Sequence, residues 1–490
     1  MSNIVKIFSR SVVPIIRISN SGRNKQQLRI MSALPSGGLA IGGPSIVAVG
    51  QMQSTNDKAG NLQQVEELVL LAAQKKAKML FLPECCDFVG ENRSETFQLV
   101  ESLDGPLMAK YKELARCHQM WLSLGGIHEL KASTTTSDDK AEQRIYNTHV
   151  VLNDLGEVAA IYRKLHLFDA TTKEIRLRES DTVAPGERLE KPVATPAGQV
   201  GLQICYDLRF AEPALLLRKL GAQVLTYPAA FTHATGKAHW EILLRARAIE
   251  TQCFVIAAAQ QGWHNKKRQS WGHAMIINPW GVVLADCGGE EKLAVGIAEI
   301  DLSQLAKIYQ SMPCFEHRRN DIYSLTAFNL SPSSAEYGED RSFANNTVDK
   351  RTIFYESEHC WAFTNLRCVV EGHVLVSTKR ITPRLNGLNC AEVTDLFATV
   401  CLVQRVLETI YGTTSATVTV QDGANAGQTV PHVHFHVMPR RNGDFGHNDQ
   451  IYVKLDERVE NLPPRTLQER IDEAEIYRTF LRNCCIKASA

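Results

Sequence analysis

The sequence predicts a layered α/β domain followed by a smaller α+β domain. Three observations support this. The chain has 490 residues, too many for one ordinary hydrophobic core. Short apolar runs alternate with helical patterns over residues 44–325, which is typical of layered α/β domains. A polar stretch rich in Ser, residues 326–342, then reads as a linker to residues 343–490.

The first region begins with a strand, a helix and a second strand. Residues 45–52 and 79–84 are apolar runs, and the second run ends at Glu84. Between them, residues 61–78 carry apolar side chains at helical spacing. Residues 273–286 contain Asn-Pro-Trp-Gly between two apolar runs, which predicts a hairpin. Further strands are expected at 119–129, 147–153, 157–164, 199–207, 222–229 and 253–259, and helices at 212–221 and 239–250.

The second region keeps its strands apart from its helix. Strands are expected at 360–367 and 371–379, and an amphipathic helix at 391–412 ends at a glycine stop signal. Residues 415–423 and the segment around 431–440 are two more strands. Such segregation is typical of an α+β domain.

Composition and charge exclude several classes of protein. The net charge is +1, but residues 1–50 hold six Lys or Arg and no acid, so the rest of the chain carries −5. A nucleic-acid polymer needs a clustered basic face, so we expect no such partner. No run of about 18 apolar residues is present, so we expect no membrane span. Thirteen cysteines without a CxxC pair indicate neither a zinc framework nor a disulfide scaffold, and favour a reducing compartment.

Residues 1–43 form a basic extension. Its first 31 residues contain serines and bases but no acid, a composition typical of a mitochondrial presequence and also of a disordered basic tail. Met31 could start a shorter cytosolic form. The expected location is therefore the cytoplasm, with mitochondria as the alternative for the longer form.

Three ionisable residues stand near the ends of predicted strands in the first region. They are Glu84, Lys164 and Cys205. A carboxylate can take the proton of a thiol that attacks a carbonyl or nitrile carbon, and a lysine can stabilise the developing oxyanion. The plainer interpretation is a packed cysteine beside two solvated charges. The three local contexts together favour the catalytic hypothesis.

These contexts resemble the three motifs of the nitrilase, or carbon–nitrogen hydrolase, superfamily. The motifs are "FLPECCDF", "YRKLHLFD" and "ICYDLRF". The resemblance covers about residues 44–325 and implies an αββα sandwich. It also implies that Glu84 is the base, Lys164 the oxyanion stabiliser and Cys205 the nucleophile, with Glu179 as a second carboxylate. The implied reaction is amide hydrolysis through a thioester without a cofactor, and the Nit-type branch implies deaminated glutathione as substrate.

Three histidines alternate with apolar residues in "PHVHFHVMPR". His432, His434 and His436 would share one face of a strand, because successive side chains point to opposite faces. A zinc site normally needs four ligands, and no acidic cluster accompanies the triplet. Three unrelated histidines would leave a stripe of polar rings to satisfy. The remaining hypothesis is nucleophilic catalysis on phosphorus by a neutral imidazole, with the glycine-containing "QDGANAGQTVPH" around the phosphates.

The spacing resembles the histidine triad superfamily, and residues 343–490 resemble its Fhit branch. This implies cleavage of diadenosine triphosphate to AMP and ADP, with His434 as nucleophile and His432 and His436 in support. It also implies that Tyr452 stands at a phosphorylation site, whereas Asn346 stands where the mammalian branch has histidine. The implied substrate contacts are Asn365, His373, Gln421, Gly427, Gln428, Thr429, Val430 and His436.

The order of the two regions resembles the invertebrate nitrilase–Fhit fusion family. This resemblance implies a bifunctional hydrolase that forms a homotetramer and acts on diadenosine polyphosphates and small amides. A divalent cation, Mg²⁺ or Mn²⁺, would assist dinucleotide hydrolysis. The alternative is a signalling protein that binds the dinucleotide on a nitrilase tetramer scaffold. The sequence leaves this choice open, because both functions use the same histidine strand.

Overall fold

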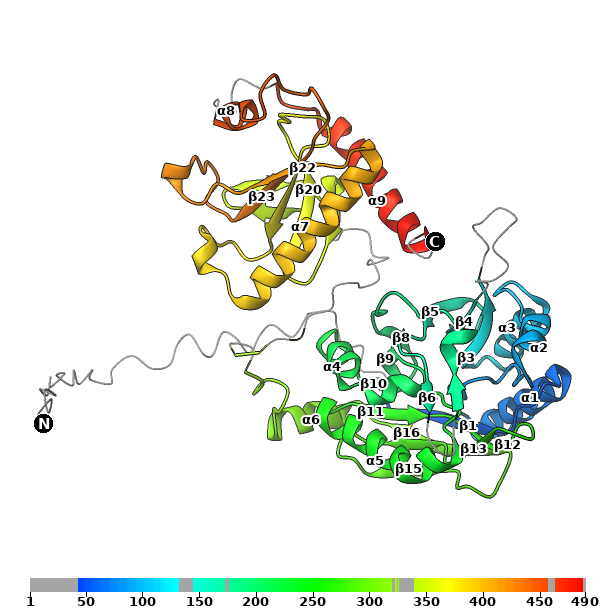
Figure 1. Ribbon diagram of the computed structural model, residues 1–490. Helices are drawn as coiled ribbons and strands as arrows, with labels where there is room; N and C mark the ends of the chain where they lie inside the picture. Colours follow the sequence, from blue (N-terminus) through cyan, green and yellow to red (C-terminus); the bar gives the residue numbers. More distant parts are fainter. Residues whose placement is uncertain are drawn as a thin grey trace, which may run out of the picture. The chain divides into compact units, whose positions relative to one another are not determined.

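The computed structural model describes residues 43–131, 144–171, 176–319, 322–323, 325, 339–456 and 463–487 (Figure 1). The predicted N-terminal extension and most of the predicted linker lie outside these residues. Within the described part of the chain, no helix is long and apolar enough to cross a membrane.

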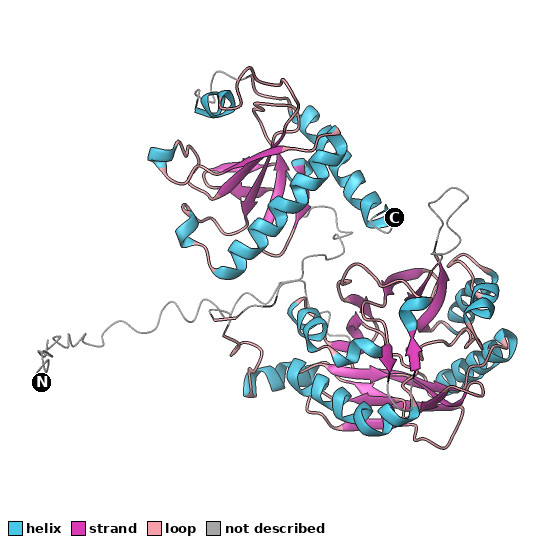
Figure 2. Cartoon of the chain, in the orientation of Figure 1, coloured by secondary structure: helices cyan, strands magenta, loops and turns pink. Residues whose placement is uncertain are grey.

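Two sheets form the centre of the first region (Figure 2). The described strands of the first sheet run in the order β13-β12-β1-β2-β3-β4-β5, and β16 pairs with β1 on a side branch. Its strands are β1 (Ser45–Met52), β2 (Met79–Leu82), β3 (Trp121–Leu130), β4 (Ile145–Leu152), β5 (Val158–Arg163), β12 (Ala259–Trp263), β13 (Gln269–Trp271) and β16 (Ala294–Ile300). The parallel pairs β1–β2, β2–β3 and β1–β12 set the carboxyl ends of these strands at one edge.

The second sheet has the described strand order β15-β14-β11-β10-β9-β8. Its strands are β8 (Val193–Thr195), β9 (Gly198–Leu202), β10 (Val224–Thr226), β11 (Phe254–Ala257), β14 (Met275–Ile277) and β15 (Val283–Asp286). The antiparallel pairing of β14 with β15 confirms the predicted hairpin. A separate two-stranded ribbon joins β6 (Asp169–Thr171) to β7 (Arg176–Arg178).

Helices cover the outer faces of both sheets, which confirms the four-layer αββα sandwich. On β1, Val47 and Val49 face the core between the sheets, whereas Ala48 faces the helix layer. This alternation follows from the two-residue period of a strand. The helices of this region are α1 (Lys58–Gln74), α2 (Arg93–Leu99), α3 (Pro106–His118), α4 (Ala211–Lys219), α5 (His233–Thr251) and α6 (Ser303–Ser311).

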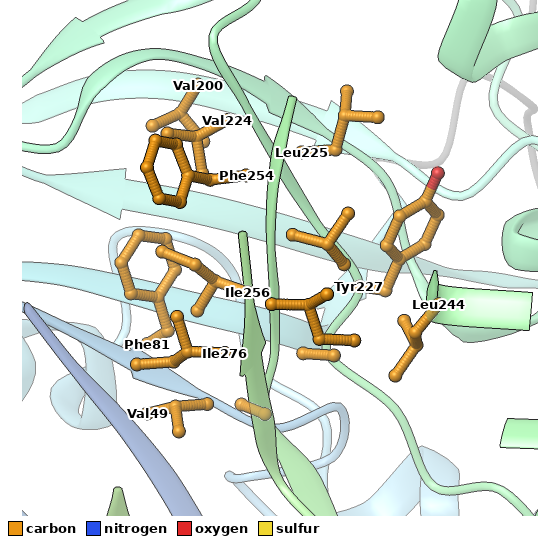
Figure 3. Packing of buried hydrophobic residues seen from close by; sticks show 14 of the residues in the cluster. Val49, Phe81, Val200, Val224, Leu225, Tyr227, Leu244, Phe254, Ile256 and Ile276 are labelled. Atoms are coloured by element: carbon orange, nitrogen blue, oxygen red, sulfur yellow. The ribbon is translucent and has the colours of Figure 1, made fainter. Parts of the chain in front are cut away.

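The core between the sheets is continuous and apolar (Figure 3). Phe81 from the first sheet packs in the same cluster as Val200, Phe254 and Ile256 from the second. Each fully buried side chain of this size contributes about 1.5–3 kcal/mol to stability. The packed layers give rigid support to the strand ends that carry the predicted site residues.

The second region contains one antiparallel sheet. Its strands run in the order β19-β20-β21-β23-β22, and a small hairpin of β17 and β18 stands apart. The strands are β17 (Arg341–Phe343), β18 (Asn346–Val348), β19 (Ile353–Glu356), β20 (Cys360–Thr364), β21 (Val374–Thr378), β22 (Ala416–Thr419) and β23 (His434–Pro439). The helices are α7 (Cys390–Tyr411), α8 (Gln450–Asp456) and α9 (Leu467–Lys487).

Helix α7 begins and ends where local chemistry directs. The Asn389 side chain accepts from Glu392 N, while the Glu392 carboxylate accepts from Asn389 N, so a capping box starts the helix. Gly412 ends it with a φ of 62°, a conformation that glycine adopts at little cost. Helices α7 and α9 share one core with one face of the sheet. The α+β prediction is therefore confirmed.

Several elements differ from the predicted ones. Strand β9 ends at Leu202, and Cys205 instead starts the 3-10 helix Cys205–Arg209. Likewise, Glu84 lies two residues beyond β2. Both residues therefore lie in turns, and the pairing of β9 and of β2 ends earlier than the apolar sequence predicted. Elements not predicted from periodicity include α3, β16 and α9.

Candidate active sites

One buried lysine joins two carboxylates in the first region. Lys164 Nζ lies 2.8 Å from Glu84 Oε1 and 2.9 and 3.0 Å from the Oε2 and Oε1 atoms of Glu179. An ammonium has three donors, so carboxylate oxygens accept all of them in this arrangement. Lys164 and Glu84 are only 2% and 3% exposed. Two acids and one base are therefore held as a unit away from bulk water.

Strand ends from different parts of the chain converge to build this unit. Glu84 follows β2, Lys164 follows β5, and Glu179 starts a 3-10 helix after β7. Phe168 N donates to Glu179 Oε2 at 2.7 Å and Glu179 N donates to Phe168 O at 3.2 Å, which fixes this carboxylate. The structure thus brings Glu179 to the lysine.

Cys205 occupies a strained turn beside the same carboxylate. Its φ is 44°, in the left-handed region that non-glycine residues seldom adopt. Cys205 N donates to Pro228 O at 2.9 Å, which holds the turn in place. The thiol is buried, and Glu84 and Lys164 both act on it electrostatically. The predicted nucleophile, base and lysine therefore meet in one place.

The resting protonation states follow from burial and charge. Burial alone would raise the pKa of Glu84, but the charge of Lys164 and its hydrogen bond outweigh burial and lower that pKa to about 2. Burial raises the pKa of the Cys205 thiol well above its usual value, and the charge of Glu84 adds to this effect. The pair therefore rests as thiol and carboxylate.

Sequence reasoning missed three contributors to this centre. Asn147 Nδ2 donates to Glu84 Oε1 at 2.9 Å and to Glu179 Oε1 at 3.2 Å. Ala230 N donates to Glu84 Oε2 at 2.9 Å. The charge of Arg268 also acts on Glu84. Asn147 was detectable as a polar residue inside a buried strand, whereas the contact of Ala230 depends on the tertiary fold alone.

The histidine strand separates its two kinds of side chain. Val433, Phe435 and Val437 belong to the core under α7 and α9. His434 and His436 lie on the opposite face, with ring centroids 5.1 Å apart. The prediction that His432 shares this strand was wrong, because β23 begins at His434 and His432 lies in a bend before it. Strand β23 pairs on both sides, with β21 and β22, so its register is fixed.

Hydrogen bonds assign the tautomer of His434. Its Nδ1 lies 2.7 Å from His432 O, and a carbonyl can only accept, so Nδ1 carries the proton. Nε2 is then left with a free lone pair. His432 is held separately, because its Nδ1 accepts from Ala344 N at 3.3 Å and its Nε2 lies 3.2 Å from Thr378 Oγ1. This tautomer is the one that the predicted nucleophilic role of His434 requires.

A second chain of hydrogen bonds assigns His436. Val369 N donates to His373 Nδ1 at 3.2 Å, so the proton of His373 sits on Nε2. That Nε2 lies 2.9 Å from His436 Nδ1, which must then accept. His436 Nε2 therefore carries a proton, and this buried donor has no partner among the described residues. The arrangement leaves one N–H donor beside the predicted nucleophile.

All four imidazoles are held in the neutral form. Burial lowers the pKa of His432 and His434 and lowers that of His436 well below its usual value. Burial lowers the pKa of His373 to about 3. A neutral imidazole retains the lone pair that a nucleophile needs.

The predicted phosphate loop curves on two glycines. Gly423 and Gly427 have φ values of 104° and 84°. Gln428 braces the loop: its Oε1 accepts from Gly423 N at 2.8 Å, and its Nε2 donates to Pro383 O at 2.9 Å. In this arrangement Gln428 supports the loop. Thr429 is exposed.

The other predicted contacts lie at different depths. Asn365 Nδ2 is 3.3 Å from His373 Nε2, so these two lie together beside the histidine strand. Val430 packs on the small apolar cluster of the sheet. Gln421 is half-buried. The Tyr452 side chain on α8 is exposed. Asn346 on β18 is also exposed.

The described residues hold no group of three or more His, Cys, Asp or Glu side chains placed to bind a metal ion.

Comparison with known families gives two matches in this order. The carbon–nitrogen hydrolase model matches residues 46–310, and the HIT domain model matches residues 346–443. Both matches agree with the two sets of residues that the structure brings together.

Whole-chain relatives combine the same two domains. The nitrilase and fragile histidine triad fusion protein NitFhit of Drosophila melanogaster is 68% identical over 481 residues, which is 98% of this chain and 99% of the relative. The crystal structure of the Caenorhabditis elegans NitFhit protein has a TM-score of 0.78 and 45% sequence identity, covering 89% of this chain and 99% of that one. The human deaminated glutathione amidase is 47% identical over 311 residues, which is 62% of this chain and 93% of the relative.

Proposed function

Because this chain belongs to the nitrilase and fragile histidine triad fusion family, we propose that it is a bifunctional hydrolase with two separate catalytic centres. One centre would hydrolyse a small amide, with deaminated glutathione as the proposed substrate. The other would hydrolyse diadenosine triphosphate to AMP and ADP, as a bis(5'-adenosyl)-triphosphatase.

The amidase proposal depends on the Glu84–Lys164–Glu179 unit beside Cys205. In the first step Glu84 takes the thiol proton while the sulfur bonds to the amide carbon. The carbon–nitrogen bond then breaks, and Glu84 returns the proton to the leaving amine. The acyl group remains on Cys205 as a thioester. Water then gives a proton to Glu84 and attacks the thioester, and the departing sulfur recovers that proton.

The lysine contacts suggest how the oxyanion is stabilised at the right moment. At rest, carboxylates accept all three Lys164 donors. When Glu84 takes the thiol proton, its carboxyl becomes neutral and its attraction for Lys164 weakens. One donor can then turn to the oxygen that has just gained charge, while Glu179 keeps the ammonium in place.

The amidase proposal is tested with Cys205→Ala and deaminated glutathione. This substrate has an oxo group in place of the α-amino group, so amide cleavage releases 2-oxoglutarate and cysteinylglycine. We expect the variant to lose at least about 1,000-fold in 2-oxoglutarate formation, since the covalent route is removed. Cys117→Ala, at an exposed cysteine, is the matched control. Full activity in the Cys205 variant would rule out the thioester.

The dinucleotide proposal depends on the assigned tautomers. His434 Nε2 would bond to the α-phosphorus as the bond to the bridging oxygen of ADP breaks, giving a nucleotidyl-histidine. The His432 carbonyl, already 2.7 Å from Nδ1, would stabilise the positive ring. The free N–H of His436 would donate to a phosphate oxygen. Water then breaks the phosphorus–nitrogen bond and releases AMP.

The proposed Mg²⁺ or Mn²⁺ would act on the phosphates of the substrate. The cation would neutralise part of their charge when bound there. In this proposal, phosphate oxygens supply most of the ligands. The residues of the histidine strand hold the nucleotide and the proton at His434 Nδ1.

The dinucleotide proposal is tested with His434→Asn. Removing the nucleophilic nitrogen should reduce the hydrolysis of diadenosine triphosphate by at least about 1,000-fold. The products are separated by chromatography, and His447→Asn, at an exposed histidine of the same region, is the control. Trapping AMP on protein that lacks His434 would contradict the assignment.

We also propose a homotetramer, on the strength of the family relationship. Light scattering of the purified protein should then give the mass of four chains of 54.6 kDa each. A monomer at micromolar concentration would contradict this assembly.

A further inference from the structure

Arg268 lies on the turn between β12 and β13, next to the amidase centre. Its backbone is held within that turn: His264 N donates to Arg268 O at 2.9 Å, and Arg268 N donates to Asn265 Oδ1 at 2.9 Å. These two hydrogen bonds close the short turn. The starting point of the Arg268 side chain is therefore fixed.

The hairpin is also fixed relative to the catalytic carboxylate. Gln260 Nε2, on β12, donates to Glu84 O at 3.0 Å and to Ser54 Oγ at 2.7 Å. His264 joins the turn to its surroundings, since its Nδ1 lies 2.7 Å from Ser54 O and its Nε2 lies 2.7 Å from Ser270 Oγ. One of these bonds joins the hairpin to Glu84, two join it to Ser54, and the bond to Ser270 lies within the hairpin itself.

Arg268 is half-buried as a residue, and its guanidinium has no ion partner among the described residues. Burial alone would lower its pKa, but neighbouring acidic groups, Glu84 and Glu179 among them, outweigh burial and raise it. Both carboxylates nevertheless accept their hydrogen bonds from Lys164, Asn147 and backbone amides. A cation thus stands beside the centre with its donors available.

Another arginine near the centre shows the opposite situation. Arg163 Nε and Nη2 donate to the two Glu129 oxygens at 2.8 and 2.6 Å, a two-pronged ion pair within the fold. The planar guanidinium suits a carboxylate in this way. An arginine without such a pair beside a reaction centre is a candidate site for a carboxylate of the substrate.

We infer that Arg268 binds a carboxylate on the acyl part of the amide substrate and so selects ω-amides of dicarboxylic acids. The inference rests on the proposed amidase function. A contact on the acyl part persists in both half-reactions, because the acyl group stays on Cys205 after the amine has left. The turn then provides specificity, while Glu84, Lys164 and Cys205 provide the chemistry.

A purely electrostatic role for Arg268 predicts different kinetics from a substrate-binding role. If its charge only tuned Glu84 and Cys205, removing it would slow every amide by the same factor. If it bound a substrate carboxylate, only substrates with that carboxylate would suffer, and chiefly in KM.

The test uses two amides of nearly equal shape. Glutaramate carries one amide and one carboxylate, and glutaramide is its uncharged counterpart. We expect Arg268→Gln to lower kcat/KM for glutaramate by about 10- to 100-fold, the range for a lost charged hydrogen bond. Any loss for glutaramide reports only the effect of the Arg268 charge on Glu84 and should be smaller, so the preference for glutaramate over glutaramide should fall by about 10-fold, and Arg268→Lys should recover part of the loss. Lys267→Gln, which removes an exposed charge from the same turn, should leave both unchanged.

Equal losses for the two amides would overturn the inference. So would a loss for deaminated glutathione without any loss for glutaramate, because the contact would then lie on the leaving side.

A binding measurement separates this inference from the proposed function. Calorimetry on Cys205→Ala protein measures glutaramate binding without turnover, with and without Arg268→Gln. If the natural chain cleaves neither amide, the amidase proposal fails for these substrates, and binding still decides the subsite. Binding that disappears with Arg268→Gln supports the subsite. Binding that is absent in both proteins, or equal in both, overturns it.

Discussion

At the scale of single residues, Asp207 connects the lysine strand to the cysteine turn. Its Oδ2 accepts from Tyr162 OH at 2.7 Å and from Ile204 N at 2.9 Å. Its Oδ1 lies 2.7 Å from His166 Nδ1 and accepts from His166 N at 3.0 Å. Asp207 itself is fully buried. One carboxylate therefore satisfies four groups from two catalytic motifs.

These contacts connect Asp207 to the residues next to Lys164 and Cys205. Tyr162 and His166 lie two residues to either side of Lys164, and Ile204 directly precedes Cys205. Holding the Ile204 amide supports the strained φ of the next residue. We regard Asp207 as a positioning residue, since small displacements of catalytic groups are costly in rate.

Asp207→Asn should separate kcat from KM. The new amide group presents a donor where two donors already converge, so we expect kcat for amide hydrolysis to fall about 10- to 100-fold. KM should change less than about 3-fold. The free energy of unfolding should fall by about 2–4 kcal/mol, as for other broken buried networks. Steady-state kinetics and denaturant unfolding measure these effects.

Asp286→Asn is a suitable control for this substitution. Asp286 also pairs with a histidine, His273 at 3.0 Å, but it lies on β15 and is 35% exposed. Its loss should leave kcat unchanged. A wild-type kcat in Asp207→Asn would contradict the positioning role.

At the scale of elements, β23 determines the protonation of the second centre. Its alternation places His434 and His436 on the face opposite the α7–α9 core, where the Phe343 ring of β17 packs edge-on against His434. Burial then lowers the pKa of His434 below its ordinary value of 6.5. The position of His434 on this strand therefore favours its neutral form and also fixes where its ring lies.

The rate of dinucleotide hydrolysis should therefore resist mild acid. A lowered pKa means that neutral His434 persists below pH 6.5 and is lost only as pH falls through the lower folded pKa. We expect kcat/KM to change less than about 2-fold from neutral pH down to the ordinary histidine pKa of 6.5, and to fall only at lower pH. Diadenosine triphosphate has no terminal phosphate, so it does not itself titrate there.

Circular dichroism at each pH would show that the fold persists. An acid limb with its midpoint at or above the ordinary histidine pKa would show that His434 is not held neutral.

At the scale of the whole molecule, each centre draws its catalytic side chains from one half of the sequence. Glu84, Lys164 and Cys205 come from the first half, and the histidine triplet comes from the last 60 or so residues. Each half also has its own core clusters. This separation makes independent chemistry the expected behaviour.

A substitution in one centre should therefore remove only the activity of that centre. Cys205→Ala should keep dinucleotide hydrolysis within about 2-fold of the natural chain, and His434→Asn should keep amide hydrolysis within the same limit. Both assays are run on the same preparations, with thermal melting to show retained fold. If either substitution removed both activities in folded protein, the centres would depend on each other.

His434→Asn also distinguishes catalysis from signalling. Equilibrium binding would show whether the variant retains the dinucleotide. If it binds without cleaving and still supports the cellular role of the protein, bound dinucleotide is the signal. If that role is lost, hydrolysis is required.

The sequence by itself determined what depends on local order. Strand and helix periods, the glycine stop of α7 and the alternation in β23 are properties of adjacent residues, and the structure confirms these elements. The chemical types of Glu84, Lys164 and Cys205 also stand in short motifs. Local order could not give the full turn structure, so the 3-10 helix at Cys205 and helix α9 were missed.

Only the tertiary structure decided which distant groups meet. Glu84 and Lys164 are separated by 80 residues, and Ala230 N reaches Glu84 across 146. The protonation states of the thiol and the imidazoles likewise follow from burial, which adjacent residues do not encode. Arg268 has no motif of its own, and its importance appears only where the fold leaves its charge unpaired beside the amidase centre. Packing of distant segments decides these features, because distance and desolvation act through space.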